Sequence, residues 1–258
     1  MPSFRQRRRG ALVLVALLVL AALLSAACRS MLSRKYEYDE EIYLALDGSA
    51  TVYINASLAA LVALRGFDLD VDPRARLRLD AIRDIYQSPV SDVVSATGSR
   101  RDNRRYVHLR IEVPDIRRLH ESAPFAWSRY VFDRHGELLR FQQQVGASAA
   151  REVGDVGWTG RELAAFRLHL PSRVPFHNSP SREIQRGNII AWEQPLADRI
   201  KGEPIAIEVH LEPQSILVHT LGLFGITILL AAATFGAAIW WVMSRGRKAD
   251  AKVTGQAG

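Results

Sequence analysis

The sequence predicts an α+β domain on an antiparallel sheet, with two helices near its start and one transmembrane helix after it. Three observations support this fold class. Runs of strand length with period-two alternation are the main pattern of the domain beyond Val90. Two earlier stretches repeat their apolar residues every three or four positions, as a helix does. Long apolar segments near both ends of the 258 residues bracket everything else.

The domain begins with a predicted β-hairpin that leads into a helix. Residues 36–46 and 50–54 have strand composition, and the Asp-Gly pair between them is a strong two-residue turn signal. Over residues 55–66 the apolar period becomes helical, with Ser57 as N-cap and a glycine as stop. A second helix is expected over residues 73–86, because its apolar residues also recur at helical spacing.

The rest of the domain is predicted to be mostly β, with short connections. A short helical stretch is expected over residues 114–120, and residues 146–160 have the composition of an extended loop. The expected strands are 93–96, 106–113, 127–132, 138–145, 163–170, 188–192 and 205–211.

The N-terminal segment has the pattern of an export signal. Basic residues precede an apolar run over 11–27, which is shorter than the ~20 residues of a spanning helix. Small residues at Ser25 and Ala27 then predict a signal peptide over residues 1–27. Cys28, the single cysteine of the chain, follows at the place where a bacterial lipobox carries its lipid. Ser25 replaces the leucine that lipoboxes favour, so ordinary cleavage before Cys28 and an uncleaved anchor stay open as alternatives to lipidation.

The C-terminal apolar segment predicts a membrane anchor. Residues 221–243 contain no charged side chain and are long enough to cross the hydrocarbon as a helix. Basic residues follow this segment and also precede the N-terminal one, and positive flanks remain in the cytoplasm. The sequence therefore predicts a plasma-membrane protein with an extracytoplasmic domain over 28–215, a transmembrane helix over 216–243 and a cytoplasmic tail over 244–258.

The net charge of +7 lies outside the predicted domain. Arginines before residue 11 and a basic excess after residue 243 account for all of it, so the stretch between is neutral. We therefore interpret the charge as a sign of membrane orientation and expect no nucleic-acid partner. The domain also has no second cysteine for a disulfide, so its stability must come from its core.

Metal-binding and catalytic patterns are missing from the sequence. The three aspartates of 68–72 have the spacing of half a calcium loop, but Pro73 and Leu79 replace its glycine and glutamate. No Gly-x-Ser-x-Gly elbow occurs, and no two histidines have the spacing that places both on one helical face. We therefore predict no cofactor and no metal. Folding could still bring together three histidines of predicted strands: His108, His169 and His210.

Four residues are candidates for contact with a ligand. Asp155 and Trp158 lie on a glycine-rich stretch, where such a pair is suited to a sugar or a lipid headgroup. Arg104 and Arg105 belong to an arginine cluster that could bind anionic headgroups, at ~1 kcal/mol for each residue near the surface. The alternative interpretation is a mobile loop and a solvated basic face without a ligand.

One segment near the end of the domain resembles the LppM-like bacterial envelope proteins. The shared pattern is a proline, a valine and an asparagine followed by Gly-Asn-x-x-x-Trp: Pro171, Val174, Asn178, Gly187, Asn188, Ile190 and Trp192. The order of export signal, early Asp-Gly hairpin and C-terminal helix with a basic tail is similar too. This resemblance implies an envelope or lipid-associated role and supplies no catalytic residue. From its residues alone, we expect Trp192 to fill the core while the asparagines bind turn backbone.

The sequence thus predicts a membrane-tethered extracytoplasmic domain that is a non-enzymatic binding module. Its expected partners are the membrane and a lipid, a glycan or an envelope protein. The alternative is an envelope hydrolase whose active site is assembled from distant strands, for which a structure would have to show paired carboxylates or converging histidines in a cleft.

Overall fold

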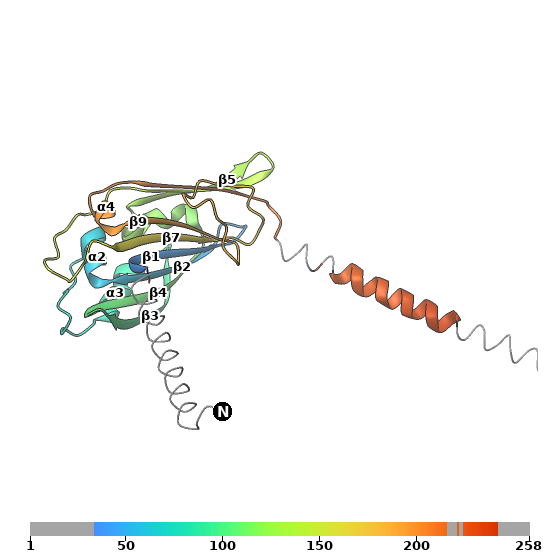
Figure 1. Ribbon diagram of the computed structural model, residues 1–258, viewed down its shortest axis with the longest axis horizontal. Coiled ribbons are helices and arrows are strands. Elements are labelled where there is room, and N and C mark those ends of the chain that lie inside the picture. Colours follow the sequence, from blue (N-terminus) through green and yellow to red (C-terminus); the bar gives the residue numbers. More distant parts are fainter. Residues whose placement is uncertain (1–33, 216–220, 222–223, 242–258) are drawn as a thin grey trace, which may run out of the picture.

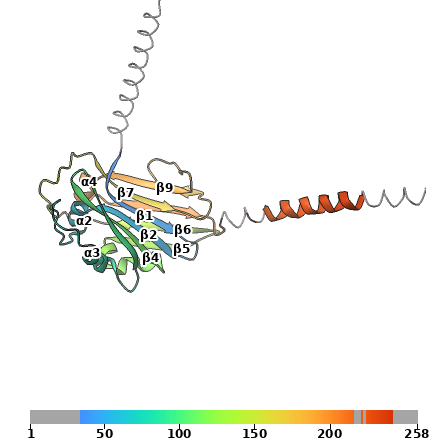
Figure 2. The same ribbon diagram turned by 90° about the horizontal axis from the view of Figure 1, so that it is seen from below.

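Two β-sheets pack against each other around one core. The computed structural model describes residues 34–215, 221 and 224–241. The larger sheet has six strands in the order β3-β4-β2-β1-β7-β9, and the smaller has four in the order β5-β6-β10-β8. Both views show the three α-helices of the domain at one end of the larger sheet (Figures 1 and 2). The predicted α+β class is therefore confirmed.

The elements occur in the predicted order, but β3 is longer than predicted, and β8 and α4 were not predicted. The larger sheet consists of β1 (Lys35–Leu44), β2 (Ala50–Ser57), β3 (Asp92–Arg101), β4 (Arg104–Val113), β7 (Glu162–His169) and β9 (Ile189–Pro195). The smaller sheet consists of β5 (Ser128–His135), β6 (Leu138–Val145), β8 (Phe176–His177) and β10 (Ile205–Leu211). The helices are α2 (Leu58–Arg65), α3 (Leu79–Tyr86), α4 (Leu196–Ile200) and the 3₁₀ turns η1 (Ile116–Glu121) and η2 (Ala123–Phe125).

Helix α2 begins and ends as its sequence predicts. The Ser57 side chain accepts a hydrogen bond from the Ala60 amide at 3.0 Å, which satisfies one free N–H of the first turn. Gly66 ends the helix in the left-handed conformation, with a φ of 70°. The predicted loop 146–160 covers the helix from outside, since the Ala149 amide donates to the Leu64 carbonyl at 2.9 Å. This cover explains why every residue from Leu58 to Leu64 is buried.

The larger sheet differs from the prediction in one pairing. Strand β1 pairs with β7 in parallel, whereas the other pairs of this sheet are antiparallel. Parallel neighbours need a crossover rather than a hairpin turn, and they come from distant parts of the chain. Here the chain passes through the second sheet and the 146–160 loop before β7 reaches β1. Local alternation cannot indicate such a partner.

The second helix is shorter than predicted. It starts at Leu79, so residues 73–78 of the expected helix are not helical. Side-chain hydrogen bonds replace the helical ones: Asp72 accepts from the Arg74 amide at 2.8 Å. The carbonyl oxygen of Ala75 accepts from Arg105 Nη1 at 3.1 Å. Local aspartate turns and a distant arginine therefore outcompete the helical pattern over this segment.

The core between the two sheets contains a buried glutamate, Glu40, with neutral hydrogen-bond partners. Alternation along β1 turns Tyr38, Glu40 and Ile42 inward, and all three are fully buried. Glu40 accepts hydrogen bonds from the Tyr38 hydroxyl at 2.8 Å and from Gln143 Nε2 of the opposite sheet at 2.7 Å. Burial raises the pKa of Glu40, although these hydrogen bonds oppose the shift. The bond to Gln143 connects the sheets through their apolar interior.

One helix beyond the domain has the length and composition to cross a membrane. It spans Phe224–Trp241 within the predicted anchor 216–243. The predicted signal peptide 1–27, Cys28 and the tail 244–258 lie outside the described residues, so these predictions and the domain boundaries at both ends stay predictions.

Candidate functional site

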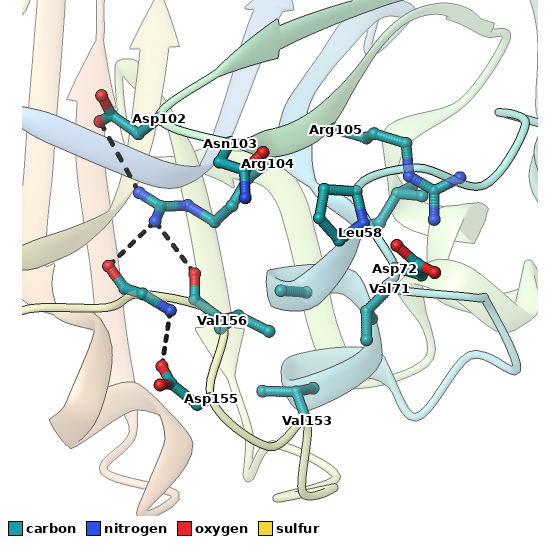
Figure 3. Close-up of a pocket in the computed structure, with 13 residues that line it drawn as sticks. Leu58, Val71, Asp72, Asp102, Asn103, Arg104, Arg105, Val153, Asp155 and Val156 are labelled. Atoms are coloured by element: carbon teal, nitrogen blue, oxygen red, sulfur yellow. Dashed lines mark hydrogen bonds and ion pairs between the residues drawn. The ribbon is translucent and has the colours of Figure 1, made fainter.

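A cavity of about 380 Å³ opens where the β3–β4 turn meets the start of α2 and two long loops. Figure 3 shows its lining. The volume falls in the usual range for small-molecule sites. The lining residues come from four separate segments: Leu58, Ala59, Val71, Asp72, Pro73, Asp102, Asn103, Arg104, Arg105, Val153, Asp155, Val156 and Gly157. Three of the four residues predicted to contact a ligand are among them.

A tight turn brings the two arginines to this place. Asp102 and Asn103 have φ angles of 49° and 57°, and short polar side chains tolerate this left-handed region better than most. Strand β4 starts directly after them with Arg104 and Arg105. Because successive residues of a strand point to opposite faces, the two guanidinium groups reach different loops.

Arg104 holds the glycine-rich loop against the sheet. Its Nη1 donates to the carbonyl oxygens of Val156 and Gly157, each at 3.1 Å. Its Nη2 contacts Glu37 Oε1 at 2.9 Å, and the residue is only 6% exposed. Burial acts to lower the pKa of Arg104, but the Tyr106 hydroxyl and the Glu37 carboxylate outweigh it and raise that pKa. The arginine is therefore a fixed cation of the fold.

Arg105 holds the other loop, over residues 66–78. It is 4% exposed, and its guanidinium donates to the carbonyl oxygens of Ala75 and Asp70. The alternative interpretation of a solvated basic face is therefore wrong for Arg104 and Arg105. Both side chains have protein acceptors, so their charge is shared with the fold before any ligand arrives.

Two acidic side chains and the amide of Asn103 remain exposed at the cavity. Asp72 and Asp155 are exposed, and each accepts a backbone N–H with one carboxylate oxygen. Asp102, in contrast, forms an ion pair with Lys35 at 3.0 Å. The hydrogen bond from Lys35 lowers the pKa of Asp102. Leu58, Val71 and several other apolar side chains form the rest of the wall. The arrangement can accept an apolar group together with hydrogen-bond donors at the rim.

Trp158 is the predicted ligand residue that does not line this cavity. It is partly buried against the core, and its indole Nε1 has no hydrogen-bond partner among the described residues. The apolar wall, in contrast, was not predicted as a site. Leu58, Val71 and Val153 come from a helix and two loops, and no local pattern in the sequence connects them. Only the tertiary fold brings them together.

The three strand histidines do not form a common site. His108 contacts Asn55 and Ser99, while His169 lies 3.3 Å from Glu41 and stacks on Tyr43. His210 belongs to the other sheet, where its Nε2 lies 3.0 Å from Glu208. Within residues 34–215, 221 and 224–241, no group of three or more metal-ligating side chains occurs.

The segment with the LppM-like pattern is structural in this fold. Trp192 is 3% exposed, and its Nε1 donates to Asn178 Oδ1 at 3.0 Å. Asn178 also accepts from the Glu208 amide at 2.9 Å and donates to the Ala206 carbonyl at 2.9 Å. Asn188 has a φ of 61° and donates to the Leu170 carbonyl at 3.0 Å. The expected core role of Trp192 is thereby confirmed, whereas Asn178 binds the backbone of strand β10 rather than that of a turn.

No protein-family model and no curated protein matches the chain. Among solved structures, the chain is similar to the NMR structure of the folded domain of LppM from Mycobacterium tuberculosis. The identity is 10% and the TM-score is 0.39, over 70% of this chain and 92% of the LppM domain. A similarity of this degree assigns no function, and membership of the LppM-like family stays a prediction.

Proposed function

We propose that the chain is a membrane-tethered envelope protein whose extracytoplasmic domain binds a lipid or glycan group in the cavity beside Arg104. The observation that carries this proposal is the cavity itself. Four separate segments form it, and buried arginines hold two of them in place. A cavity of about 380 Å³ has the size of a site for a small chemical group. A protein partner would instead need a broad contact surface.

The chemistry of the lining narrows the ligand class. Arg104 and Arg105 already bind carbonyl and carboxylate oxygens of the protein, so an anionic headgroup would gain little from them. Asp72 and Asp155 instead offer acceptor oxygens at the rim. We therefore expect the polar part of the ligand to carry hydroxyl or ammonium donors, and its apolar part to lie on Leu58, Val71 and Val153.

Tethering is the second part of the proposal. The helix Phe224–Trp241 has the length and composition of a membrane span. Its position after the domain, together with the predicted signal and the basic flanks, supports an extracytoplasmic domain with a cytoplasmic tail. A C-terminal reporter that works only in the cytoplasm should be active. External protease should digest the domain and leave the reporter, and an externally accessible tail would contradict this orientation.

Lipid attachment at Cys28 is proposed as a further anchor. Radiolabelled fatty acid should enter the wild-type chain and be absent from Cys28→Ser, since no other cysteine is present. Equal labelling of both chains, or labelling of neither, would leave cleavage or an uncleaved segment as the N-terminal state.

Native mass spectrometry of the full chain, released from its own membrane in detergent, tests the ligand site. Wild-type protein should carry a lipid or glycan adduct. Val153→Trp should lose it, because the larger side chain fills the cavity. Val94→Trp is the matched control, since Val94 is exposed on β3 and does not line the cavity. An adduct that persists in Val153→Trp, or none in the wild type, would contradict the proposed function.

A further inference from the structure

The outer face of the larger sheet carries a second group of chemically complementary side chains. Asn55 of β2 and His108 of β4 are directly opposite each other in the strand register. Ser99 of β3 is a diagonal neighbour, since His108 pairs with Thr97 and Ser99 with Tyr106. Directly paired residues of neighbouring strands point to the same face, so all three side chains lie together. The cavity beside Arg104 includes none of them.

Two hydrogen bonds connect these side chains in series. Ser99 Oγ lies 2.8 Å from His108 Nε2, and His108 Nδ1 lies 2.9 Å from Asn55 Oδ1. Because the amide oxygen of Asn55 can only accept, Nδ1 carries a proton, and in the neutral imidazole Nε2 then has the free lone pair. The Ser99 hydroxyl therefore donates to Nε2. A nucleophile bound to a base, which a third group orients, is the arrangement of nucleophilic catalysis.

We propose that Ser99, His108 and Asn55 form a nucleophilic serine site that accepts carboxylic esters. Ser99 Oγ attacks the carbonyl carbon while its proton passes to His108 Nε2. The ester C–O bond then breaks, and the alcohol leaves with that proton. Water hydrolyses the resulting acyl-serine by the same route and releases the acid. Ser99 and His108 are the catalytic residues, and Asn55 is a positioning residue that fixes the imidazole tautomer.

Position and charge around Ser99 fit this role. Ser99 is exposed on β3, which is an edge strand of the sheet, so an ester can reach the hydroxyl. Arg101 follows two residues later and therefore lies on the same face. Its guanidinium is held 4.5 Å from the Tyr106 ring centre and donates to the Tyr106 hydroxyl at 3.0 Å. Its Nη2 also donates to the Tyr36 carbonyl oxygen at 2.6 Å, so Arg101 is a fixed cation on the nucleophile's face whose Nη2 is already bound by the protein.

Labelling of the full chain in detergent with a fluorophosphonate probe tests the site, with peptide mass spectrometry to locate the adduct. Wild type should be modified at Ser99, and Ser99→Ala should not be modified there or elsewhere. His108→Gln, which keeps a polar side chain beside Asn55, should react at least ~100-fold more slowly because the base is lost. Ser95→Ala is the control on the same strand and should react like wild type.

The positioning role of Asn55 is tested by the labelling rate of two variants, which a purely structural role would leave unchanged. Asn55→Ala should slow labelling, and Asn55→Asp should restore it, because a carboxylate accepts the same Nδ1 proton. All variants should keep the melting temperature of wild type. Wild-type labelling no faster than that of heat-denatured protein, or His108→Gln labelled at the wild-type rate, would overturn the proposal. Because the cavity is a different site, loss of the adduct in Val153→Trp would leave this labelling unchanged.

Discussion

Neighbouring carboxyl groups of β1 have different partners on the two faces of the larger sheet. Glu40 points inward and is bound by neutral groups, among them the Tyr38 hydroxyl and Gln143. Asp39 points outward and pairs with Arg167 of β7. Both groups are buried, and burial raises the pKa of each. The inner acid is held by hydrogen bonds to neutral groups, and the outer one by an ion pair in a polar layer.

This difference shows that the outer face is more than a solvated surface. Its charged and hydroxyl side chains contact one another across the strands, from Glu37 and Arg104 at one end to His169 and Glu41 near the other. The inner face supplies stability through apolar packing. The outer face supplies charge, acceptors and a nucleophile, and its end borders the cavity. The comparison predicts that inward and outward substitutions have different consequences.

The largest expected effect is the loss of an inward aromatic side chain. Trp192→Ala should destabilise the full chain by ~3–5 kcal/mol, because it removes a buried indole and one of the two donors to Asn178 Oδ1. Thermal unfolding followed by circular dichroism measures this change. Glu193→Ala is the outward control on the next residue, and it should cost under ~1 kcal/mol, as partly exposed ion pairs do. Equal costs for the two variants would break the comparison.

The second effect is a pH dependence that originates on the outer face. Burial raises the pKa of Asp39 to about 7, with a further rise from Glu41 and opposition from Arg167. The folded chain therefore binds the proton of Asp39 more tightly than the unfolded chain does. The stability that this proton contributes to the fold is lost as pH rises from about 4 to about 7. The loss is on the order of 4 kcal/mol at most, at ~1.4 kcal/mol for each pKa unit.

Denaturant titrations at several pH values measure this slope. Asp39→Asn should remove it, because an amide does not titrate. Glu41 acts in the other direction: a hydrogen bond with His169 is the main cause that lowers its pKa. The contribution of Glu41 to stability is lost only as pH falls below about 4.5, the ordinary pKa of a glutamate, so it meets this window only at its acidic end. Parallel pH profiles for wild type and Asp39→Asn would show that Asp39 does not take up the proton.

The third prediction concerns the inward acid. Glu40→Ala should cost ~1–3 kcal/mol, because the Tyr38 hydroxyl and the Gln143 amide lose their buried acceptor. Glu40→Gln keeps an acceptor oxygen and should cost less than the alanine variant. Urea unfolding of both variants at neutral pH gives the two values. A glutamine variant less stable than the alanine variant would indicate that the ionised carboxylate is required there.

Local patterns predicted most elements of this fold but not the cavity or the outer layer. Ser57 and Gly66 act within a few residues of their positions, so their cap and stop could be predicted from the sequence. The loss of the first turns of the expected helix 73–86 could not be predicted from local sequence, because Arg105 of a distant strand binds the Ala75 carbonyl. The parallel β1–β7 pair and the contact between Asn55 and His108 likewise depend on strand order.

The most direct test of the proposed function is photo-crosslinking in living cells. A benzophenone amino acid replaces Pro73, which is half-buried at the cavity rim, or Val94 on exposed β3. After illumination, peptide mass spectrometry should find a lipid or glycan mass added at position 73 and none at position 94. No addition at 73, or the same addition at both positions, would contradict a ligand site between these loops.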